Sequence, residues 1–193
     1  MLTARFEEAL VFATRLHAGQ TRKGSDIPYV SHLLAVAATV LEQGGGEDEA
    51  IAALLHDAVE DQGGAKTRDE IARRFGSPVA AIVEACSDSD TVPKPPWRAR
   101  KEAFIARLYQ APDSVRLVAA ADKLHNARSI LADYQVHGEA LWDRFTATKE
   151  ENFWYYRTLR DAFMAVGPRA LAEALDRVVC ELEERAGMSS TAG

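Results

Sequence analysis

Ala52-Ala-Leu-Leu-His56-Asp57-Ala-Val-Glu60-Asp61 is an apolar helical run that ends in four residues able to bind a metal or exchange protons. Side chains four positions apart share a face of a helix, so a helix here places His56 with Glu60 and Asp57 with Asp61. Carboxylates packed together against a core are unfavourable unless a positive charge compensates them. A divalent cation is the simplest compensation, and a solvated helix end with an incidental histidine is the alternative for this stretch alone.

Two further segments offer ligands of the same type. His32 lies in Pro28-Tyr-Val-Ser-His32, and Asp122 follows an apolar run in Ala119-Ala-Ala-Asp122-Lys-Leu-His125-Asn126. Two imidazoles and two carboxylates form a mixed nitrogen and oxygen set, which suits Mn²⁺, Fe²⁺ or Zn²⁺ better than Ca²⁺ or Mg²⁺.

The rest of the chain predicts an all-α fold. Its 193 residues, 47% of them hydrophobic, are enough for one substantial core. Apolar residues recur at helical spacing almost everywhere, and no stretch alternates with the period of a strand. We expect a single compact multi-helix bundle over residues 1–187 and a flexible tail over 188–193.

Capping and turn signals predict the helix bounds. A capping box at Thr67 and Glu70 predicts the start of a short helix that ends near Phe75. Ser77 and Pro78 read as the cap and first residue of the next helix, which runs to about Cys86. The other predicted helices span 3–17, 29–43, 47–59, 97–109, 112–132, 140–166 and 168–186.

Charge and composition exclude several classes of function. The formal net charge of −6 argues against a general nucleic-acid binder, because counterion release needs a basic surface. No apolar run approaches the ~18 residues of a membrane span, and no basic-then-apolar leader begins the chain. Cys86 and Cys180 lie far apart and outside any CxxC motif, so we predict neither a disulfide framework nor a thiolate zinc site. We expect a cytoplasmic protein with a small-molecule partner.

The order of these motifs resembles the HD superfamily of metal-dependent phosphohydrolases and, more narrowly, the hydrolase domain of RelA/SpoT-type alarmone enzymes. The resemblance covers roughly residues 5–163, and the remaining length leaves no room for a synthetase or regulatory domain. It is therefore to the stand-alone small alarmone hydrolases. The matching segments are His17-Ala-Gly-Gln20-Thr-Arg22-Lys23, Pro28-Tyr29 with His32, the 52–61 stretch, Phe75-Gly76 and Ala121-Asp122-Lys-Leu-His125-Asn126.

The resemblance implies an activity and a role for each matching residue. The implied enzyme uses manganese to remove the 3′-diphosphate of (p)ppGpp, releasing pyrophosphate and GDP or GTP. The implied metal ligands are His32, His56, Asp57 and Asp122. The implied catalytic residues are Glu60 and Asp61, which activate and orient water, and the implied substrate-binding residues are Arg22, Lys23, Asn126 and Tyr156.

Nearby residues of the same chemical types receive other interpretations. His17 and His125 fall inside the matching motifs, but we interpret them as structural hydrogen-bonding groups outside the metal shell. The basic group of Lys94, Arg98, Arg100 and Lys101 is interpreted as a solvated helix start, with closure over phosphates as the alternative.

Departures from the family pattern leave the substrate open. Leu33 stands where the longer enzymes usually have proline, and Ser87-Asp-Ser-Asp90 replaces a Thr-Lys element near the expected nucleotide site. An adenine counterpart such as pApp is therefore an alternative substrate. Two other functions also remain: an HD nucleotide phosphohydrolase of another type, such as a nucleoside monophosphatase or a deoxynucleoside triphosphate triphosphohydrolase, and a non-catalytic nucleotide-binding HD protein.

Overall fold

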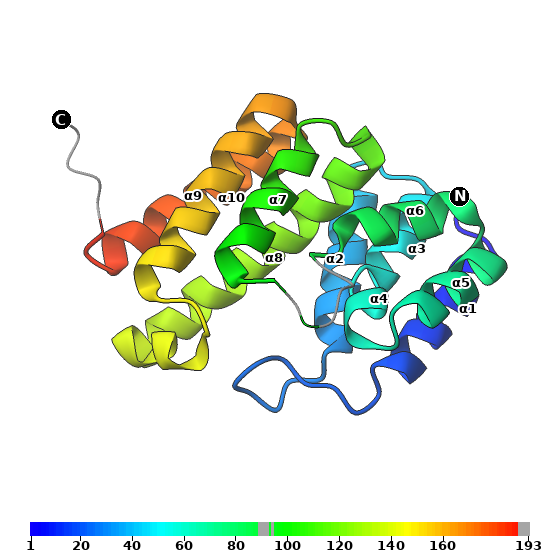
Figure 1. Cartoon of the computed structure of the whole chain (residues 1–193), viewed down its shortest axis with the longest axis horizontal. Coiled ribbons are helices and arrows are strands. Elements are labelled where there is room, and N and C mark those ends of the chain that lie inside the picture. The colour runs from blue at the N-terminus through cyan, green and yellow to red at the C-terminus, as the bar shows by residue number, and fades with distance from the viewer. Residues whose placement is uncertain (89–92, 94, 189–193) are drawn as a thin grey trace.

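The computed structural model describes residues 1–88, 93 and 95–188, and these fold almost entirely as helices (Figure 1). Within these residues the extended pairing is limited to a single antiparallel bridge between Thr21 and Pro28. The all-α prediction is confirmed. The helices are α1 (Ala4–Leu16), α2 (Val30–Glu42), α3 (Glu47–Leu55), α4 (Ala58–Asp61), α5 (Ala65–Phe75), α6 (Ser77–Cys86), α7 (Trp97–Leu108), α8 (Asp113–His137), the 3-10 helix η1 (Gly138–Arg144), α9 (Lys149–Val166) and α10 (Arg169–Arg185).

Helices α2, α3 and α8 pack against one another at the centre of the molecule. Helices α1, α5 and α6 lie on one side of this centre, and α7, α9 and α10 lie on the other (Figure 1). Leu33 of α2, Leu54 of α3 and Leu124 of α8 are almost completely buried in the shared core. Each of these leucines lies one or two residues from a predicted metal ligand in the sequence, so the packing that buries them brings the ligands together.

The predicted helix over 47–59 is interrupted at His56 and Asp57, which separate α3 from α4. In a continuous helix the Ala53 carbonyl would accept from the Asp57 amide. Here that carbonyl lies 2.8 Å from the His56 ring nitrogen Nδ1. Asp57 has φ −95° and ψ −3°, at the edge of the helical region. Asp57 therefore lies in the turn that precedes α4, and Asp61 is the last residue of α4. The two residues do not belong to one uninterrupted helix with α3.

The capping box predicted at Thr67 is wrong. Helix α5 begins two residues earlier, after Gly64, and the Thr67 hydroxyl donates to the carbonyl of Gln62. Glu70 pairs with Arg73 and Arg74 instead of the helix start. The predicted cap at Ser77 is also wrong, because Ser77 is the first residue of α6 and Gly76 is its cap.

The predicted helices over 112–132 and 140–166 also have different bounds. Helix α8 continues to His137 and ends at Gly138, whose φ of +56° lies in the left-handed region that glycine tolerates. A true capping box begins α9: the Glu151 amide donates to Thr148 Oγ1 at 3.2 Å, and the Thr148 amide donates to Glu151 Oε2 at 2.8 Å. The 3-10 helix η1 therefore lies where a single long helix was expected.

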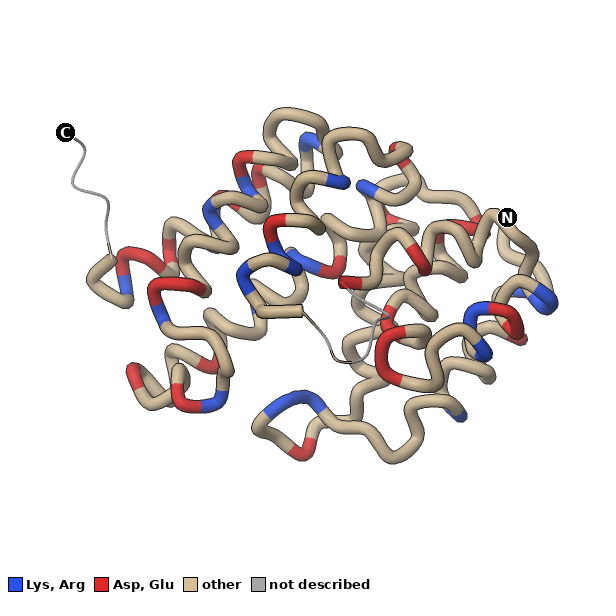
Figure 2. The backbone as a smooth tube through the Cα atoms, viewed as in Figure 1, with Lys and Arg blue, Asp and Glu red and all other residues tan. Residues whose placement is uncertain are grey.

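Within the residues that the structure describes, every helix is too short or too polar to cross a bilayer. Figure 2 shows acidic and basic residues spread over the whole fold, with a basic segment on the loop between α1 and α2 and an acidic segment at α4. Some residues named in the sequence analysis lie outside the described part of the chain: Ser89, Asp90, Lys94 and the tail over 189–193.

Candidate metal and nucleotide site

Four predicted metal ligands place one atom each around a common point between α2, α8 and the α3–α4 junction. His32 Nε2 lies 3.2 Å from His56 Nε2, 3.2 Å from Asp122 Oδ1 and 3.7 Å from Asp57 Oδ2. His56 Nε2 lies 3.0 Å from Asp57 Oδ2 and 3.5 Å from Asp122 Oδ1. The three helical segments thus bring together residues that are as far as 90 positions apart in the sequence (122 − 32).

The other ring nitrogens of the two histidines are already in use. His56 Nδ1 donates to the Ala53 carbonyl at 2.8 Å, so its Nε2 has a free lone pair in the neutral ring. His32 Nδ1 lies 2.7 Å from His125 Nδ1, and in the tautomer that carries its proton on Nδ1 the neutral His32 ring donates to His125 and keeps a lone pair on Nε2. Burial lowers the pKa of His32, and burial together with His32 and Arg22 lowers the pKa of His125 to about 4. In these neutral tautomers both Nε2 atoms are available as metal ligands beside the two carboxylate oxygens.

This donor set fits a single divalent cation. Bonds of ~2.1 Å to one ion place ligand atoms ~3.0 Å apart at right angles and ~3.4 Å apart at tetrahedral angles. The separations that involve the two histidine Nε2 atoms, 3.0 to 3.7 Å, lie in or just above this range. The ligand atoms of His32, His56 and Asp57 all lie within 4.8 Å of one another, and Asp122 joins this group through its contacts with the two histidines. The charges of Asp57 and Asp122 outweigh burial and raise the pKa of His56, which shows how strongly this point favours a positive charge.

Three neighbouring side chains hold the two carboxylates in place. Tyr29 donates its hydroxyl proton to Asp57 Oδ2, the oxygen that faces the histidines. Lys123 donates to Asp122 Oδ2 at 2.6 Å, and Asn126 donates to Asp122 Oδ1 at 2.6 Å. Hydrogen-bonded partners of this kind fix the orientation of metal ligands. Sequence reasoning did not identify Tyr29 or Lys123 in this role, although both lie inside the motifs that it used.

Glu60 and Asp61 lie on α4, directly after the ligand pair at the α3–α4 junction. Gln20 Nε2 donates to Asp61 Oδ2 at 2.7 Å, and Gln20 Oε1 lies 2.7 Å from His17 Nδ1. Burial, opposed by the Gln20 hydrogen bond and assisted by the charges of Asp57 and Glu60, raises the pKa of Asp61. A carboxylate with a raised pKa beside a cation site is a suitable proton acceptor.

A cavity of about 440 Å³ adjoins the ligand cluster, between the α1–α2 loop, α8 and α9. All four predicted substrate-binding residues line it: Arg22, Lys23, Asn126 and Tyr156. Arg22 Nη2 donates to Asn126 Oδ1 at 2.8 Å. The buried Tyr156 supplies part of an aromatic wall together with Phe145. The cavity therefore combines basic groups with apolar surfaces, as a nucleotide site requires.

Comparison with known proteins gives this architecture a family. A family model described as HD domain matches residues 9–150, which is most of the chain. The chain belongs to the HD domain family.

Named relatives of this HD domain are described as alarmone hydrolases. The chain is 40% identical over 126 residues to the guanosine-3′,5′-bis(diphosphate) 3′-pyrophosphohydrolase MESH1 of Xenopus tropicalis, a match that covers 64% of this chain and 68% of the relative. It is 34% identical over 132 residues to the bifunctional (p)ppGpp synthase/hydrolase SpoT of Escherichia coli, covering 65% of this chain and 18% of SpoT. A solved metazoan ortholog of SpoT that is described as hydrolysing ppGpp has a TM-score of 0.77 and 25% identity, covering 98% of this chain and 99% of that one.

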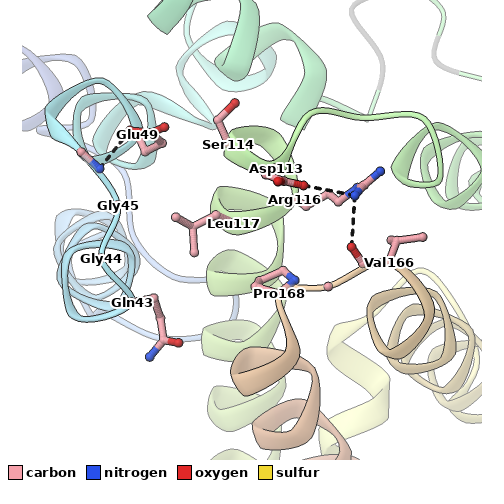
Figure 3. Close-up of a pocket in the computed structure, with 12 residues that line it drawn as sticks. Gln43, Gly44, Gly45, Glu49, Asp113, Ser114, Arg116, Leu117, Val166 and Pro168 are labelled. Atoms are coloured by element: carbon pink, nitrogen blue, oxygen red, sulfur yellow. Dashed lines mark hydrogen bonds and ion pairs between the residues drawn. The ribbon is translucent and has the colours of Figure 1, made fainter.

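A second cavity of this HD domain, of about 460 Å³, lies at the N-terminal ends of α3, α8 and α10 (Figure 3). Its charged groups already have partners. Glu49 Oε2 accepts from the Gly46 amide at 3.0 Å, and Arg116 Nη1 donates to Asp113 at 3.2 Å and to the Val166 carbonyl at 3.1 Å. None of the predicted site residues lines it. The predicted substrate-binding residues line the 440 Å³ cavity instead.

The basic group at the start of α7 is not simply solvated. Arg100 Nη1 donates to Asp88 Oδ2 at 3.2 Å, and Lys101 donates to the same oxygen. Arg98 pairs with Glu102 at 2.8 Å, and its guanidinium lies 3.1 Å from the centre of the Trp154 ring. The interpretation as a solvated helix start is therefore wrong for Arg100 and Lys101, whose side chains are largely buried with Asp88. Lys94 lies outside the described residues.

Proposed function

We propose that this HD domain is a manganese-dependent hydrolase that removes the 3′-diphosphate of (p)ppGpp, releasing pyrophosphate and GDP or GTP. The observation that supports it most strongly is the convergence of His32, His56, Asp57 and Asp122 beside the 440 Å³ cavity. Relatives described as guanosine-3′,5′-bis(diphosphate) 3′-pyrophosphohydrolases support the choice of substrate. The mixed nitrogen and oxygen ligands favour Mn²⁺ over Mg²⁺ or Ca²⁺.

The proposed mechanism divides the work between two groups of side chains. A divalent ion held by His32, His56, Asp57 and Asp122 would lower the pKa of a coordinated water from ~15.7 towards neutrality and would draw negative charge from the phosphoryl oxygens. Glu60 and Asp61, next to the ligand pair, accept the proton of the attacking water and orient it. The leaving group is the ribose 3′-oxygen, so the bond that breaks joins this oxygen to phosphorus.

Binding of the nucleotide is assigned to the cavity. Arg22 and Lys23 neutralise the diphosphate, with the forked guanidinium able to make two parallel hydrogen bonds. Arg22 is connected through Asn126 to Asp122, so the phosphate-binding group is held in place relative to this predicted metal ligand. Tyr156 packs against the nucleoside. This arrangement holds the 3′-phosphorus near the cation while the rest of the nucleotide occupies the cavity.

Product analysis with a panel of nucleotides tests the proposed function. The purified chain is incubated with Mn²⁺ and ppGpp, pppGpp, pApp, ordinary nucleoside triphosphates or deoxynucleoside monophosphates. Pyrophosphate released only from 3′-diphosphorylated nucleotides is the expected result, with no turnover after removal of the metal by a chelator. Orthophosphate or triphosphate released from ordinary nucleotides would instead identify an HD phosphohydrolase of another type. Binding without turnover of any nucleotide would identify a non-catalytic protein.

A further inference from the structure

One face of α8 runs from the ligand cluster along the whole cavity. Asp122, Asn126, Ser129 and Asp133 follow one another at intervals of four, three and four residues, so they share this face. Asn126, Ser129 and Asp133 all line the 440 Å³ cavity. Eleven residues of helix separate Asp133 from Asp122 by ~16 Å at ~1.5 Å per residue. Asp133 therefore lies at the end of the cavity remote from the ligand cluster, where the base of an extended nucleotide would lie.

Asp133 is unusual among the residues around this cavity. It is the one carboxylate among the described residues that line it. The nearest cation is Arg144, whose Nη1 lies 3.9 Å from Asp133 Oδ2, too far for a hydrogen bond, and 47% of the Asp133 side chain is exposed. A carboxylate at the wall of a polyphosphate site repels its ligand unless the ligand donates hydrogen bonds to it.

We propose that Asp133 selects guanine at this cavity by accepting hydrogen bonds from the ring N1–H and the exocyclic amino group. The proposal rests on the hydrolase function above and names the residue that determines its base preference. Guanine offers two parallel donors on one edge, which match the two oxygens of a carboxylate. Adenine offers one amino donor beside the bare nitrogen N1, whose lone pair faces a carboxylate oxygen and is repelled by it.

The walls beside Asp133 suit the faces of a purine. Ile130, on the same side of α8, and Phe145, directly after η1, both line the cavity. The Lys23 ammonium lies 5.5 Å from the centre of the Phe145 ring, so a cation lies beside this aromatic wall. These apolar surfaces accept either purine, and the serine hydroxyls of the cavity can donate or accept. Asp133 is the one carboxylate among the described side chains that line the cavity, and a carboxylate accepts hydrogen bonds without donating them.

Asp133 has a competing structural interpretation as a loose partner of Arg144. Arg144 also lies against Gly24 of the α1–α2 loop, since an added Cβ at Gly24 would come within 2.7 Å of Arg144 Cδ. If Asp133 only holds Arg144 against the α1–α2 loop, its loss would lower the turnover of every nucleotide by the same factor. A role in base selection would change the ratio between bases, so the ratio separates the two interpretations.

The test compares kcat/KM for the 3′,5′-bis(diphosphates) of guanosine, inosine and adenosine with the wild-type chain and Mn²⁺. Inosine keeps N1–H and lacks the exocyclic amino group, so it measures one of the two hydrogen bonds. Asp133→Asn removes one acceptor and adds a donor suited to adenine N1. Asp143→Asn, an exposed acid-to-amide change outside the cavity, is the matched control. Circular dichroism verifies that each variant is folded.

The wild-type chain and the Asp143→Asn control are expected to prefer guanosine over adenosine by about tenfold or more, with inosine between them. Asp133→Asn is expected to reduce this preference by about tenfold, mainly through a lower kcat/KM for guanosine. An unchanged ratio in Asp133→Asn would overturn the role of Asp133, as would equal turnover of all three bases by the wild type. Either of these results would leave the proposed hydrolase function standing. If the wild-type chain cleaves none of the three nucleotides, both the hydrolase function and the role of Asp133 are overturned.

Discussion

Asn126 donates a hydrogen bond from Nδ2 to Asp122 Oδ1 at 2.6 Å, and its own Oδ1 accepts one from Arg22 Nη2 at 2.8 Å. The same Asp122 oxygen lies 3.2 Å from His32 Nε2. One amide therefore connects a proposed phosphate-binding guanidinium to a proposed metal ligand. Substrate charge and metal geometry are coupled through Asn126, which sequence reasoning assigned to the substrate alone.

Asn126→Ala is predicted to weaken Mn²⁺ binding by about 10- to 100-fold, because Asp122 loses the donor that orients it. Calorimetric titration of the metal-stripped chain with Mn²⁺ measures this change. Ser129→Ala, one turn further along the same cavity wall, is the control and should leave Mn²⁺ binding unchanged. Equal Mn²⁺ affinity in Asn126→Ala and wild type would show that Asn126 does not support the ligand.

Tyr29→Phe is predicted to weaken Mn²⁺ binding by about tenfold while leaving the fold intact. The change removes the hydroxyl that donates to Asp57 Oδ2 and keeps the ring that stacks on His17 at 5.3 Å. Thermal unfolding of the metal-free variant should match that of the wild type within a few degrees. A variant that binds Mn²⁺ as tightly as the wild type would argue that Asp57 is oriented by the backbone alone.

Gln20→Ala is predicted to shift the acidic limb of the pH–rate profile to higher pH. The Gln20 hydrogen bond to Asp61 stabilises the charged carboxylate and opposes the effect of burial, so its loss raises the pKa of Asp61 further. A base works only when deprotonated, and a higher pKa means that activity is lost at a higher pH as the solution is acidified. The profile of kcat/KM against pH, measured at saturating Mn²⁺, checks this. A limb that does not move, or that moves to lower pH, would remove Asp61 from the proton-accepting pair.

Asp88→Ala is predicted to destabilise the fold by about 3 kcal/mol at pH 7, because it leaves the buried charges of Arg100 and Lys101 without their shared partner. Burial alone would raise the pKa of Asp88, but Lys123 and Lys101 outweigh it and lower this pKa. The stabilisation is therefore complete above the unfolded-state pKa of ~3.9 and declines as pH falls through the lower folded-state value.

Urea unfolding of Asp88→Ala at several pH values measures this difference. Asp113→Asn is the control, since Asp113 is 99% exposed beside Arg116 and should change stability by a few tenths of a kcal/mol. A destabilisation that stays constant down to pH 3 would contradict the ionic explanation.

The sequence was sufficient to predict the all-α fold and the meeting of its distant motifs, because each motif lies beside residues with core-forming periodicity. It was not sufficient to predict how those motifs are joined. The break at His56 depends on a ring nitrogen that takes the carbonyl of Ala53, and the pairing of Asp88 with α7 depends on tertiary packing. Neither contact has a local sequence signal. The α8–η1 boundary was missed because Gly138 was not recognised as a helix end.

His56→Ala and Asp57→Ala are each predicted to abolish Mn²⁺ binding and turnover while leaving helix content intact. Each variant removes one of four converging ligand atoms at the interrupted helix. Metal content after dialysis, circular dichroism and hydrolysis assays check the three parts of this prediction. Retained activity in both variants would refute the assignment of the metal site.

Hydrolysis of ppGpp by the Mn²⁺-loaded chain in ¹⁸O-labelled water, followed by ³¹P NMR, tests the central claim most directly. Attack of water on the phosphorus next to the ribose 3′-oxygen places one ¹⁸O atom in pyrophosphate and leaves GDP unlabelled, which is the predicted result. Release of orthophosphate, or label in the nucleotide product, would show that a different bond is broken and would contradict the assigned reaction.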